Sequence, residues 1–418
     1  MKTRLTLVVF IILGLFLTAL VSRSSALALM TLPFLFYLGA GLLTAPGPAS
    51  LRAVRVLTQT RSQPDAAITM KITIHNDGKS IPRLHIREQA WPKMEITEGD
   101  LESWAALPAG ETAGLAYTFQ APRGEYRWDT IQVTASDPFG LFETRLDLPA
   151  PAQLRVVPDQ VSQYRLPLRL SRTLRIPGPN LSRLPGSGTD FYGVREYHPG
   201  DSMRWIHWRR SARHPGSFFS KDFEREEMAD VGLLVDASAP SGFRPEMDSL
   251  YEYSIQAAAV LAKSFLHAGN RVSLLTLGER VARVFPGSGK RQLVRILDEL
   301  AGCSPGGKVS LDMLKYLPVR LFPSHSLIVV ISPLRQRDFS AIARLRADGY
   351  QVLLVSPDPV RFASRTKIGR LASLAVRSAR LERAALLWRI RELGVQVIDC
   401  QVDQPFLTSA GALRWARR

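Results

Sequence analysis

Hydrophobic residues fill two stretches at the start of the chain. Residues 5–21 (LTLVVFIILGLFLTALV) carry no charge, and a helix of that length spans about 26 Å, close to the roughly 30 Å hydrocarbon core of a bilayer. Residues 26–43 form a second uncharged stretch that contains Pro33, which a membrane helix tolerates. The pattern predicts two membrane-spanning helices, at 5–21 and 26–43, joined as a hairpin within residues 1–45.

A secretory signal is the alternative for this region. A basic start precedes the first stretch, and Ala26-Leu27-Ala28 resembles a cleavage site. The second apolar stretch begins at that site, which favours the hairpin. Apart from Arg23 in the connection, the basic residues near the two stretches lie outside them: Lys2, Arg4, Arg52, Arg55 and Arg61. The positive-inside rule then predicts a multi-pass protein of the cell membrane, with the soluble domains on the cytoplasmic side.

After a linker at 44–48 the pattern changes to short alternating segments. Residues 68–74 (ITMKITI) alternate apolar and polar positions, and the turn residues Asn76-Asp77-Gly78 follow, as in a half-buried strand that enters a hairpin. Similar segments occur at 115–119 and 131–135. Short strands between turns, without a helical period, predict a small β-sandwich over residues 50–158.

The last part of the chain alternates buried strands with helices. Residues 231–235 (VGLLV) form a continuous apolar run, as in a strand buried on both faces of a parallel sheet. The next segment places apolar residues on one helical face: Leu250, Ala257, Leu261, Phe265 and Ala268. Further strand-like runs follow at 272–277, 327–331, 352–355 and 395–398. The alternation predicts a doubly wound α/β domain over 230–418, in which ligands usually bind at the carboxyl ends of the strands.

Net charge and cysteine content indicate what kind of partner and which cellular compartment to expect. A formal net charge of +17 favours an anionic neighbour, either nucleic acid or a lipid surface. Cys303 and Cys400 are the only cysteines, and their spacing matches neither a zinc site nor a disulfide framework, which predicts a reducing compartment. No phosphate loop, nucleophile elbow or H-E-x-x-H motif occurs. We therefore expect no catalytic residues and a protein that is not an enzyme.

Asp236 and Ser238 follow the first strand of the α/β domain, where carboxylate and hydroxyl oxygens suit Mg²⁺. They resemble the start of the metal-ion-dependent adhesion site, D-x-S-x-S, of von Willebrand factor A domains. Pro240 stands at the third ligand position, and Pro333 stands where the later acidic ligand of that family falls. The resemblance implies a von Willebrand factor A-like domain. The two gaps favour a site without a cofactor, and a Mg²⁺-dependent protein-binding module is the alternative.

Residues 186–213 (GSGTDFYGVREYHPGDSMRWIHWRRSAR) form a dense signature between the two soluble domains. It resembles that of the family called domain of unknown function 58, which is close to G-x-D-F-x-G-x-R-x-Y-x-x-G-D-x-x-R-x-I-x-W-x-x-S-A-R. We take seven of the matching positions as site residues: Asp190, Arg195, Tyr197, Asp201, Arg204, Trp208 and Arg213. His207 stands where the family usually has Asp or Asn.

The resemblance extends over most of the chain. Family members are similar in having two N-terminal membrane spans, a β-rich region with a segment like Asp137-Pro138-Phe139-Gly140-Leu141-Phe142, the signature, and a von Willebrand-like domain. In bacteria they are often encoded beside MoxR-type AAA+ ATPases and transglutaminase-like membrane proteins. The resemblance implies a membrane-anchored, non-enzymatic adaptor that works with such an ATPase in a chaperone-like assembly system.

Three interpretations of the signature, which lies in the connection at 159–229, stay open. Arg–carboxylate pairs and tryptophan faces form a structural clasp in the first, and losing a carboxylate would then leave buried arginines unpaired, at about 3 to 5 kcal/mol. In the second, unpaired arginines bind the acidic surface of a partner protein. In the third, arginine and tryptophan bind nucleic acid, which the absence of a known nucleic-acid-binding motif disfavours.

Overall fold

A computed structural model describes residues 2–45, 50–159, 180–238, 250–306, 311, 320–363, 370–402 and 406. It divides the chain into two compact units, Met1–Val157 and Pro158–Arg418. The first unit contains the apolar helices and a β-sandwich. The second contains a long β-hairpin and an α/β domain.

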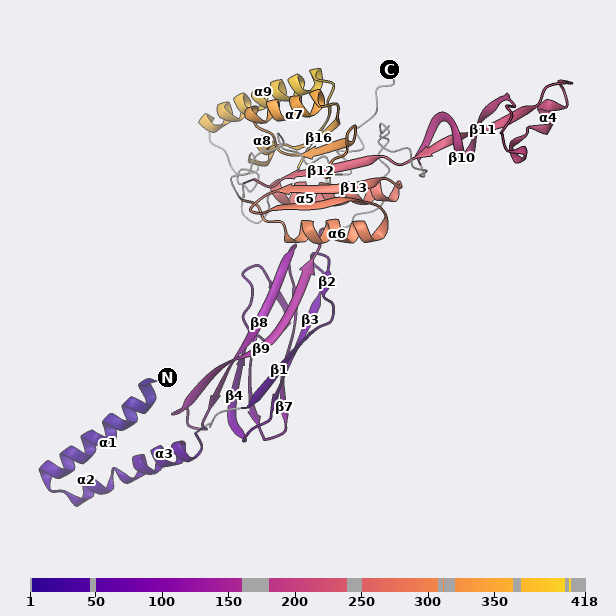
Figure 1. Ribbon diagram of the computed structural model, residues 1–418. Helices are drawn as coiled ribbons and strands as arrows, with labels where there is room; N and C mark the ends of the chain where they lie inside the picture. Colours follow the sequence, from indigo (N-terminus) through magenta and orange to yellow (C-terminus); the bar gives the residue numbers. More distant parts are fainter. Residues whose placement is uncertain are drawn as a thin grey trace. The chain divides into compact units, whose positions relative to one another are not determined.

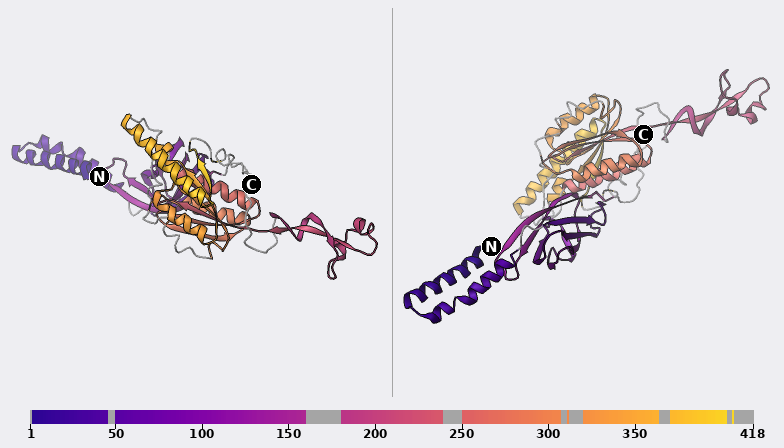
Figure 2. Two further views of the ribbon diagram at one scale, coloured as in Figure 1. Left: turned by 90° about the horizontal axis from the view of Figure 1, so that it is seen from above. Right: turned by 60° about the horizontal axis from the view of Figure 1, so that its bottom comes forward.

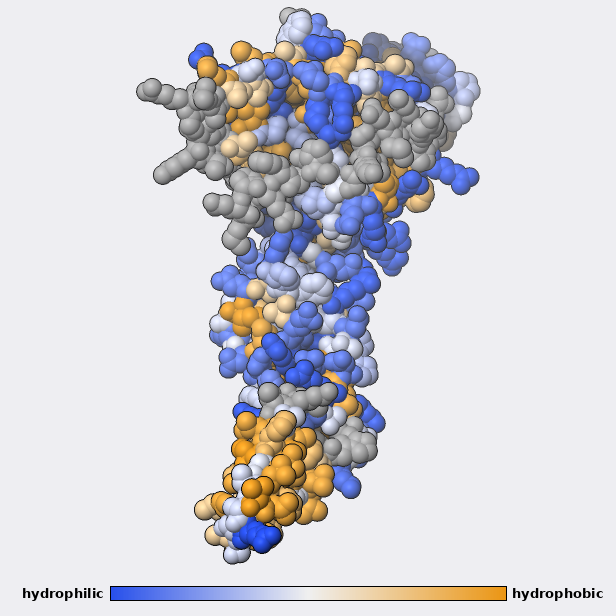
Figure 3. Space-filling model, turned by 90° about the vertical axis from the view of Figure 1, so that its left-hand side faces the viewer, coloured by the Kyte–Doolittle hydropathy of each residue, from blue (hydrophilic) through white to orange (hydrophobic). Residues whose placement is uncertain are grey.

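Three helices make up the apolar N-terminus: α1 (Lys2–Ser22), α2 (Ser25–Leu29) and α3 (Leu32–Leu43). α1 lies beside α2 and α3 (Figures 1 and 2), and large apolar side chains cover their surface (Figure 3). The stretches Arg4–Ser22 and Ser25–Leu43 are long and apolar enough to cross a membrane. An exposed apolar surface of this extent is typical of membrane association. The second stretch is interrupted between α2 and α3, because Pro33 lacks the N–H that would continue the helix.

Two sheets form the sandwich, and all of their strand pairs are antiparallel except one. The first sheet has the order β1-β3-β7-β5, with β1 (Leu51–Leu57), β3 (Ile68–Asn76), β7 (Thr112–Gln120) and β5 (Glu95–Gly99). The second has the order β2-β9-β8-β4-β6, with β2 (Arg61–Ser62), β9 (Glu143–Val156), β8 (Gly124–Ser136), β4 (Ile81–Arg87) and β6 (Glu102–Leu107). β2 pairs with β9 in parallel. The alternation at 68–74 corresponds to β3, whose Ile68, Met70, Ile72 and Ile74 are fully buried.

One buried ion pair lies within this sandwich. The Arg55 guanidinium donates to Glu88 Oε2 at 2.6 Å, and the two side chains are 0% and 1% exposed. Arg55 also donates to the carbonyls of Ala150 and Thr130. The pair links the first strand of one sheet to strands of the other, since Thr130 lies in β8 and Ala150 in β9.

The segment 137–142 packs against the end of α3. Asp137 is fully buried, and its carboxylate accepts hydrogen bonds from the backbone N–H groups of Phe139 (3.0 Å) and Phe142 (2.7 Å). Phe139 lies with its ring centroid 4.9 Å from that of Tyr37 in α3. Gly41 faces the same loop so closely that an added Cβ would lie 2.9 Å from Leu141 Cδ1. The loop 137–142 of the sandwich therefore packs directly against α3.

The α/β domain has a single six-stranded sheet with the order β14-β13-β12-β15-β16-β17. The strands are β12 (Asp230–Asp236), β13 (Arg271–Leu277), β14 (Val281–Gly287), β15 (Leu327–Ile331), β16 (Gln351–Pro357) and β17 (Gln396–Cys400). All pairs are parallel except β13 with β14. The order reverses between β12 and β15, which is the position where doubly wound sheets usually hold ligands.

Helices cover both faces of this sheet. Figure 1 shows α7 (Phe339–Ala347) and α9 (Arg370–Glu392) on one face, and α5 (Leu250–His267) and α6 (Gly289–Gly302) on the other. The short helix α8 (Pro359–Ala363) follows β16. The predicted apolar face of α5 is buried at Leu250, Ala257, Leu261 and Phe265. The antiparallel edge strand β14 was not predicted, because only one of its residues, Val284, is buried and the strand lacks a continuous apolar run.

The predicted connection at 159–229 contains regular structure from residue 180 onward. β10 (Asn180–Glu196) pairs antiparallel with β11 (Phe219–Glu227) to form a long hairpin. The segment between the strands contains a 3-10 turn, η1 (Met203–Trp205), and the one-turn helix α4 (Trp208–Ser211). Glycine and proline interrupt the strand pattern of β10, whose register shifts near Pro185, Gly186 and Gly193.

Candidate functional site

The signature residues lie at the tip of the β10–β11 hairpin, and Arg195 joins two carboxylates there. Its guanidinium donates to Asp201 Oδ1 at 2.6 Å and to Asp222 Oδ1 at 3.1 Å. Asp201 belongs to the turn after β10, and Asp222 belongs to β11. Arg195 therefore ties the turn to both strands of the hairpin.

Asp201 also shapes the turn that it caps. Its second carboxylate oxygen accepts the backbone N–H of His198 at 3.0 Å, and the Tyr197 hydroxyl donates to its carbonyl at 3.3 Å. The hydrogen bond from Arg195, followed by that from the His198 backbone, holds the pKa of Asp201 below its usual value. The fixed positions R-x-Y-x-x-G-D thus form one local hydrogen-bonded turn.

His207, the position where the sequence departs from the expected Asp or Asn, is the N-cap of α4. Its ring nitrogen Nδ1 accepts the backbone N–H of Arg210 at 3.1 Å, so it is the N-cap of α4. Ser211 at the end of α4 accepts the backbone N–H of Phe219 at 2.9 Å. His207 and Ser211 together hold α4 against the start of β11.

Most of the remaining signature side chains face solvent. We call the exposed side chains of residues 203–218 the tip surface. Its large apolar members are Met203 (76% exposed), Trp205 (37%), Trp208 (62%) and Phe218 (55%). Trp208 packs edge-on against Phe218, with ring centroids 6.4 Å apart. Residues 202–221 hold four arginines and no acidic residue, so the tip surface is both apolar and cationic.

These positions bear on the first of the three interpretations of the signature, the structural clasp. Arg195, Tyr197 and Asp201 come together, whereas Arg204, Trp208 and Arg213 are exposed. The clasp interpretation required buried arginines, but Arg204 and Arg213 are exposed and the Arg195 side chain is 38% exposed, so its penalty of about 3 to 5 kcal/mol for buried charges does not apply to them. The side chain of Asp190 lies outside the described residues.

A second polar cluster lies at the carboxyl ends of β12 and β15. Asp236 is buried, and its two oxygens accept from the Ser238 N–H at 3.0 Å and the Ser332 hydroxyl at 2.8 Å. The Arg335 guanidinium donates to the Ser238 hydroxyl at 3.0 Å. The two predicted metal-site residues therefore come together at the point where the strand order reverses. Protein donors engage both Asp236 oxygens and the Ser238 hydroxyl.

Asp338 lies at the edge of the same cluster. It is 1% exposed, accepts the Arg335 backbone N–H at 2.8 Å, and has side-chain nitrogens of Arg335 and Arg337 within 3.9 Å. Burial, more than any neighbouring charge, raises the pKa of its carboxyl group. A divalent cation at this cluster would have to displace these hydrogen bonds and compete with the Arg335 guanidinium.

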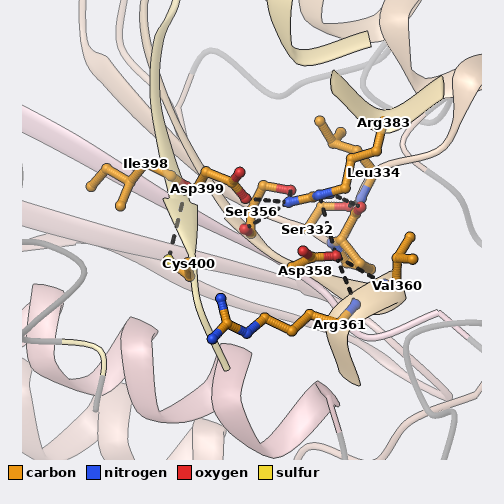
Figure 4. Close-up of polar contacts among 11 residues, drawn as sticks. Ser332, Leu334, Ser356, Asp358, Val360, Arg361, Arg383, Ile398, Asp399 and Cys400 are labelled. Atoms are coloured by element: carbon orange, nitrogen blue, oxygen red, sulfur yellow. Dashed lines mark hydrogen bonds and ion pairs between the residues drawn. The ribbon is translucent and has the colours of Figure 1, made fainter. Parts of the chain in front are cut away.

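Arg383 forms a third polar cluster, at the ends of β15, β16 and β17 (Figure 4). Its side chain is 10% exposed and reaches from α9 to the carbonyls of Pro333 (3.2 Å) and Ser356 (3.1 Å). It also donates to Asp399 Oδ1 at 2.7 Å and lies 3.5 Å from Asp358 Oδ1. The guanidinium therefore links α9 to the carboxyl ends of β15, β16 and β17.

Sequence reasoning missed several residues that complete these clusters: Asp222, Ser332, Arg335, Asp338 and Arg383. Apart from the local contacts of Asp338 with Arg335 and Arg337, the partners that these residues meet in the clusters described above are distant in sequence, and none of the five stands in a recognised motif. Ser332 was passed over in favour of the neighbouring Pro333. The only local signal was Asp338, an acidic residue just before a helix, which is a common capping position.

Comparisons with solved structures give distant likenesses. An aerotolerance-related membrane protein from Bacteroides fragilis is 15% identical, with 44% of this chain and 96% of that chain covered and a TM-score of 0.31. A proximal thread matrix protein of the mussel byssus is 17% identical (32% and 38% covered, TM-score 0.25). A FixG-related protein from Vibrio parahaemolyticus is 14% identical (27% and 98% covered, TM-score 0.18). No curated protein matches the chain.

A family model does match the sequence, over residues 193–361. The match begins in the last residues of β10 and ends within α8. It includes the Arg195–Asp201 turn, the tip surface and the cluster around Asp236. The resemblance noted in the signature is thereby confirmed: residues 193–361 match the model of the protein family of unknown function DUF58.

Proposed function

We propose that this protein is a non-enzymatic, membrane-anchored adaptor, and that the tip surface of the β10–β11 hairpin binds a partner protein. The observation that carries the proposal is the solvent exposure of Trp208 and Phe218 among arginines that have no acidic residue beside them in sequence. Large aromatic side chains and arginine are enriched at the energetic centres of protein interfaces. The cationic character favours an acidic surface on the partner.

The hydrogen bonds of Arg195 to Asp201 and Asp222 support this proposal, because they hold the backbone under the tip surface in one conformation. Asp201 and Asp222 fix the turn, while His207 and Ser211 fix α4. A preorganised surface loses less conformational entropy when it binds. The structural and the binding interpretations of the signature are thus compatible, since different residues carry them.

We further propose a MoxR-type AAA+ ATPase as the partner, in a chaperone-like assembly system. This choice comes from the family resemblance. In the same proposal α1 and the stretch α2–α3 both span the cell membrane, and the flanking basic residues keep the soluble domains in the cytoplasm. The strand order, with its antiparallel edge strand β14, supports a domain of the von Willebrand factor A type.

The test is a gentle detergent pull-down of the full-length protein from its native membrane. The test variant is Arg204→Ala/Arg213→Ala, and Arg291→Ala/Arg295→Ala on α6 is the matched control, because these arginines are also exposed. We expect an ATPase to co-purify with the native protein and the control, and at least tenfold less with the test variant.

Two outcomes would contradict this proposal. Equal recovery of partners by all three proteins would exclude Arg204 and Arg213 from docking. Loss of the partner after nuclease treatment of the lysate would show that nucleic acid bridges the two, and the tip surface would then be a nucleic-acid site. Circular dichroism and amide exchange of β10 and β11 check that each variant is folded.

A further inference from the structure

The outer face of α9 carries a row of exposed apolar side chains. Leu374, Leu381 and Trp388 are 62%, 72% and 61% exposed, and they recur every seven residues, so they lie on one side of the helix. Ala384 and Ala385, also exposed, lie between them. The inner face is separate and already packed: Leu386, Leu387 and Ile390 are buried in the core of the α/β domain.

Arginines flank this row. Arg377, Arg380, Arg389 and Arg391 are exposed, against two acidic residues, Glu382 and Glu392, on the same part of the helix. Of the four, Arg389 also stacks on the Phe339 ring of α7, with its Cζ 4.3 Å from the ring centroid. Arg383, by contrast, is neutralised at the sheet edge by Asp358 and Asp399. The outer face of α9 is therefore apolar along its centre and basic at its sides, which is the composition of helices that lie in the interface of an anionic bilayer.

We propose that the outer face of α9 docks on an anionic lipid surface. From Leu374 to Trp388 the helix extends about 21 Å, which allows it to lie along a bilayer with its apolar row among the headgroups. Trp388 suits that depth, because tryptophan is enriched at membrane interfaces. Each arginine near an anionic leaflet strengthens the contact about fivefold.

Two observations favour lipid over a second copy of the chain. Pairing two α9 faces would bring their arginines together, which is unfavourable for like charges. The chain also carries its own apolar helices, α1 to α3, at its N-terminus. A tethered domain meets the bilayer at high effective concentration, so even a weak contact would be populated. The proposal is independent of any partner that binds the tip surface.

The test uses the full-length protein in lipid nanodiscs and one introduced cysteine. Cys303 and Cys400 are buried, so Ala385→Cys on the outer face of α9 can be labelled selectively with the fluorophore NBD. Val294→Cys on α6, 42% exposed in the native protein, is the matched control site on the other face of the sheet. The discs contain phosphatidylcholine alone or with about one third phosphatidylglycerol, and doxyl-labelled lipid reports contact with the bilayer by quenching NBD.

We expect quenching and a blue shift at position 385 in anionic discs only, and neither at position 294. Arg377→Gln/Arg380→Gln in the Ala385→Cys background should lower the ratio of docked to free domain roughly 30-fold. Absence of quenching in anionic discs would overturn the proposal. Quenching that is equal in neutral and anionic discs, and unchanged by the arginine substitutions, would overturn it as well. A blue shift without lipid quenching that rises with the number of copies per disc would assign the face to a second chain, and would overturn it equally.

Discussion

Arg383 offers a direct test of how α9 is attached to its sheet. We predict that Arg383→Met destabilises the α/β domain, whereas Arg380→Met, the same chemical change one turn earlier on an exposed side chain, has little effect. Arg383 is 10% exposed and holds the carbonyls of Pro333 and Ser356 together with Asp358 and Asp399. Methionine would fill much of the volume but would leave these acceptors without their donor.

The magnitude follows from the groups that lose a partner. A buried acceptor without a donor costs about 1 to 3 kcal/mol, so about 2 to 6 kcal/mol is the upper range for these two part-buried carbonyls. Asp399 adds little, because its side chain is 47% exposed and water can replace the guanidinium. An exposed arginine such as Arg380 normally changes stability by less than about 0.5 kcal/mol when replaced.

Hydrogen exchange measured by mass spectrometry on the full-length protein resolves this difference, since the chain holds several domains and a single unfolding midpoint would mix them. Protection in β16, β17 and α9 should fall by roughly one and a half to four orders of magnitude in Arg383→Met, at 1.4 kcal/mol per tenfold change. Protection in the β-sandwich should not change. Equal protection in the two variants would refute the idea that Arg383 anchors α9.

Two further predictions concern other buried charges. Glu88→Ala should destabilise the sandwich by about 3 to 5 kcal/mol, because it leaves the Arg55 guanidinium buried and unpaired, whereas Arg55→Met/Glu88→Leu should cost much less; a double variant as unstable as the single one, by exchange in β1 and β8, would contradict this. Burial raises the pKa of Asp338, so the folded domain binds that proton more tightly than the unfolded chain. Its contribution to stability is complete below the unfolded pKa of about 3.9 and declines as the pH rises through the raised folded pKa. Asp338→Asn should remove that part of the pH dependence, and an unchanged slope of stability against pH would show that another group is responsible.

Periodicity and local chemistry were sufficient to identify many elements. The apolar stretches became α1 and the pair α2 and α3. The alternation at 68–74 became β3, and the apolar run at 231–235 became the centre of β12. The turn formed by Arg195, Tyr197 and Asp201 was also accessible from the sequence, because its hydrogen bonds join residues within a few positions of one another. In each case the physical cause is local: side chains alternate or repeat with the element's own period.

Which charged residues are buried was decided only by the tertiary structure. Arg380 and Arg383 lie three positions apart on one helix, yet one faces solvent and the other closes the sheet edge. Arg55 stands among the basic residues that follow the apolar stretches, yet it is fully buried against Glu88. The hairpin β10–β11 and the meeting of Asp236 with Ser332 likewise depend on contacts between distant positions. Periodicity describes each element alone, whereas burial of a charge depends on which other elements pack against it, and that arrangement exists only in the folded chain.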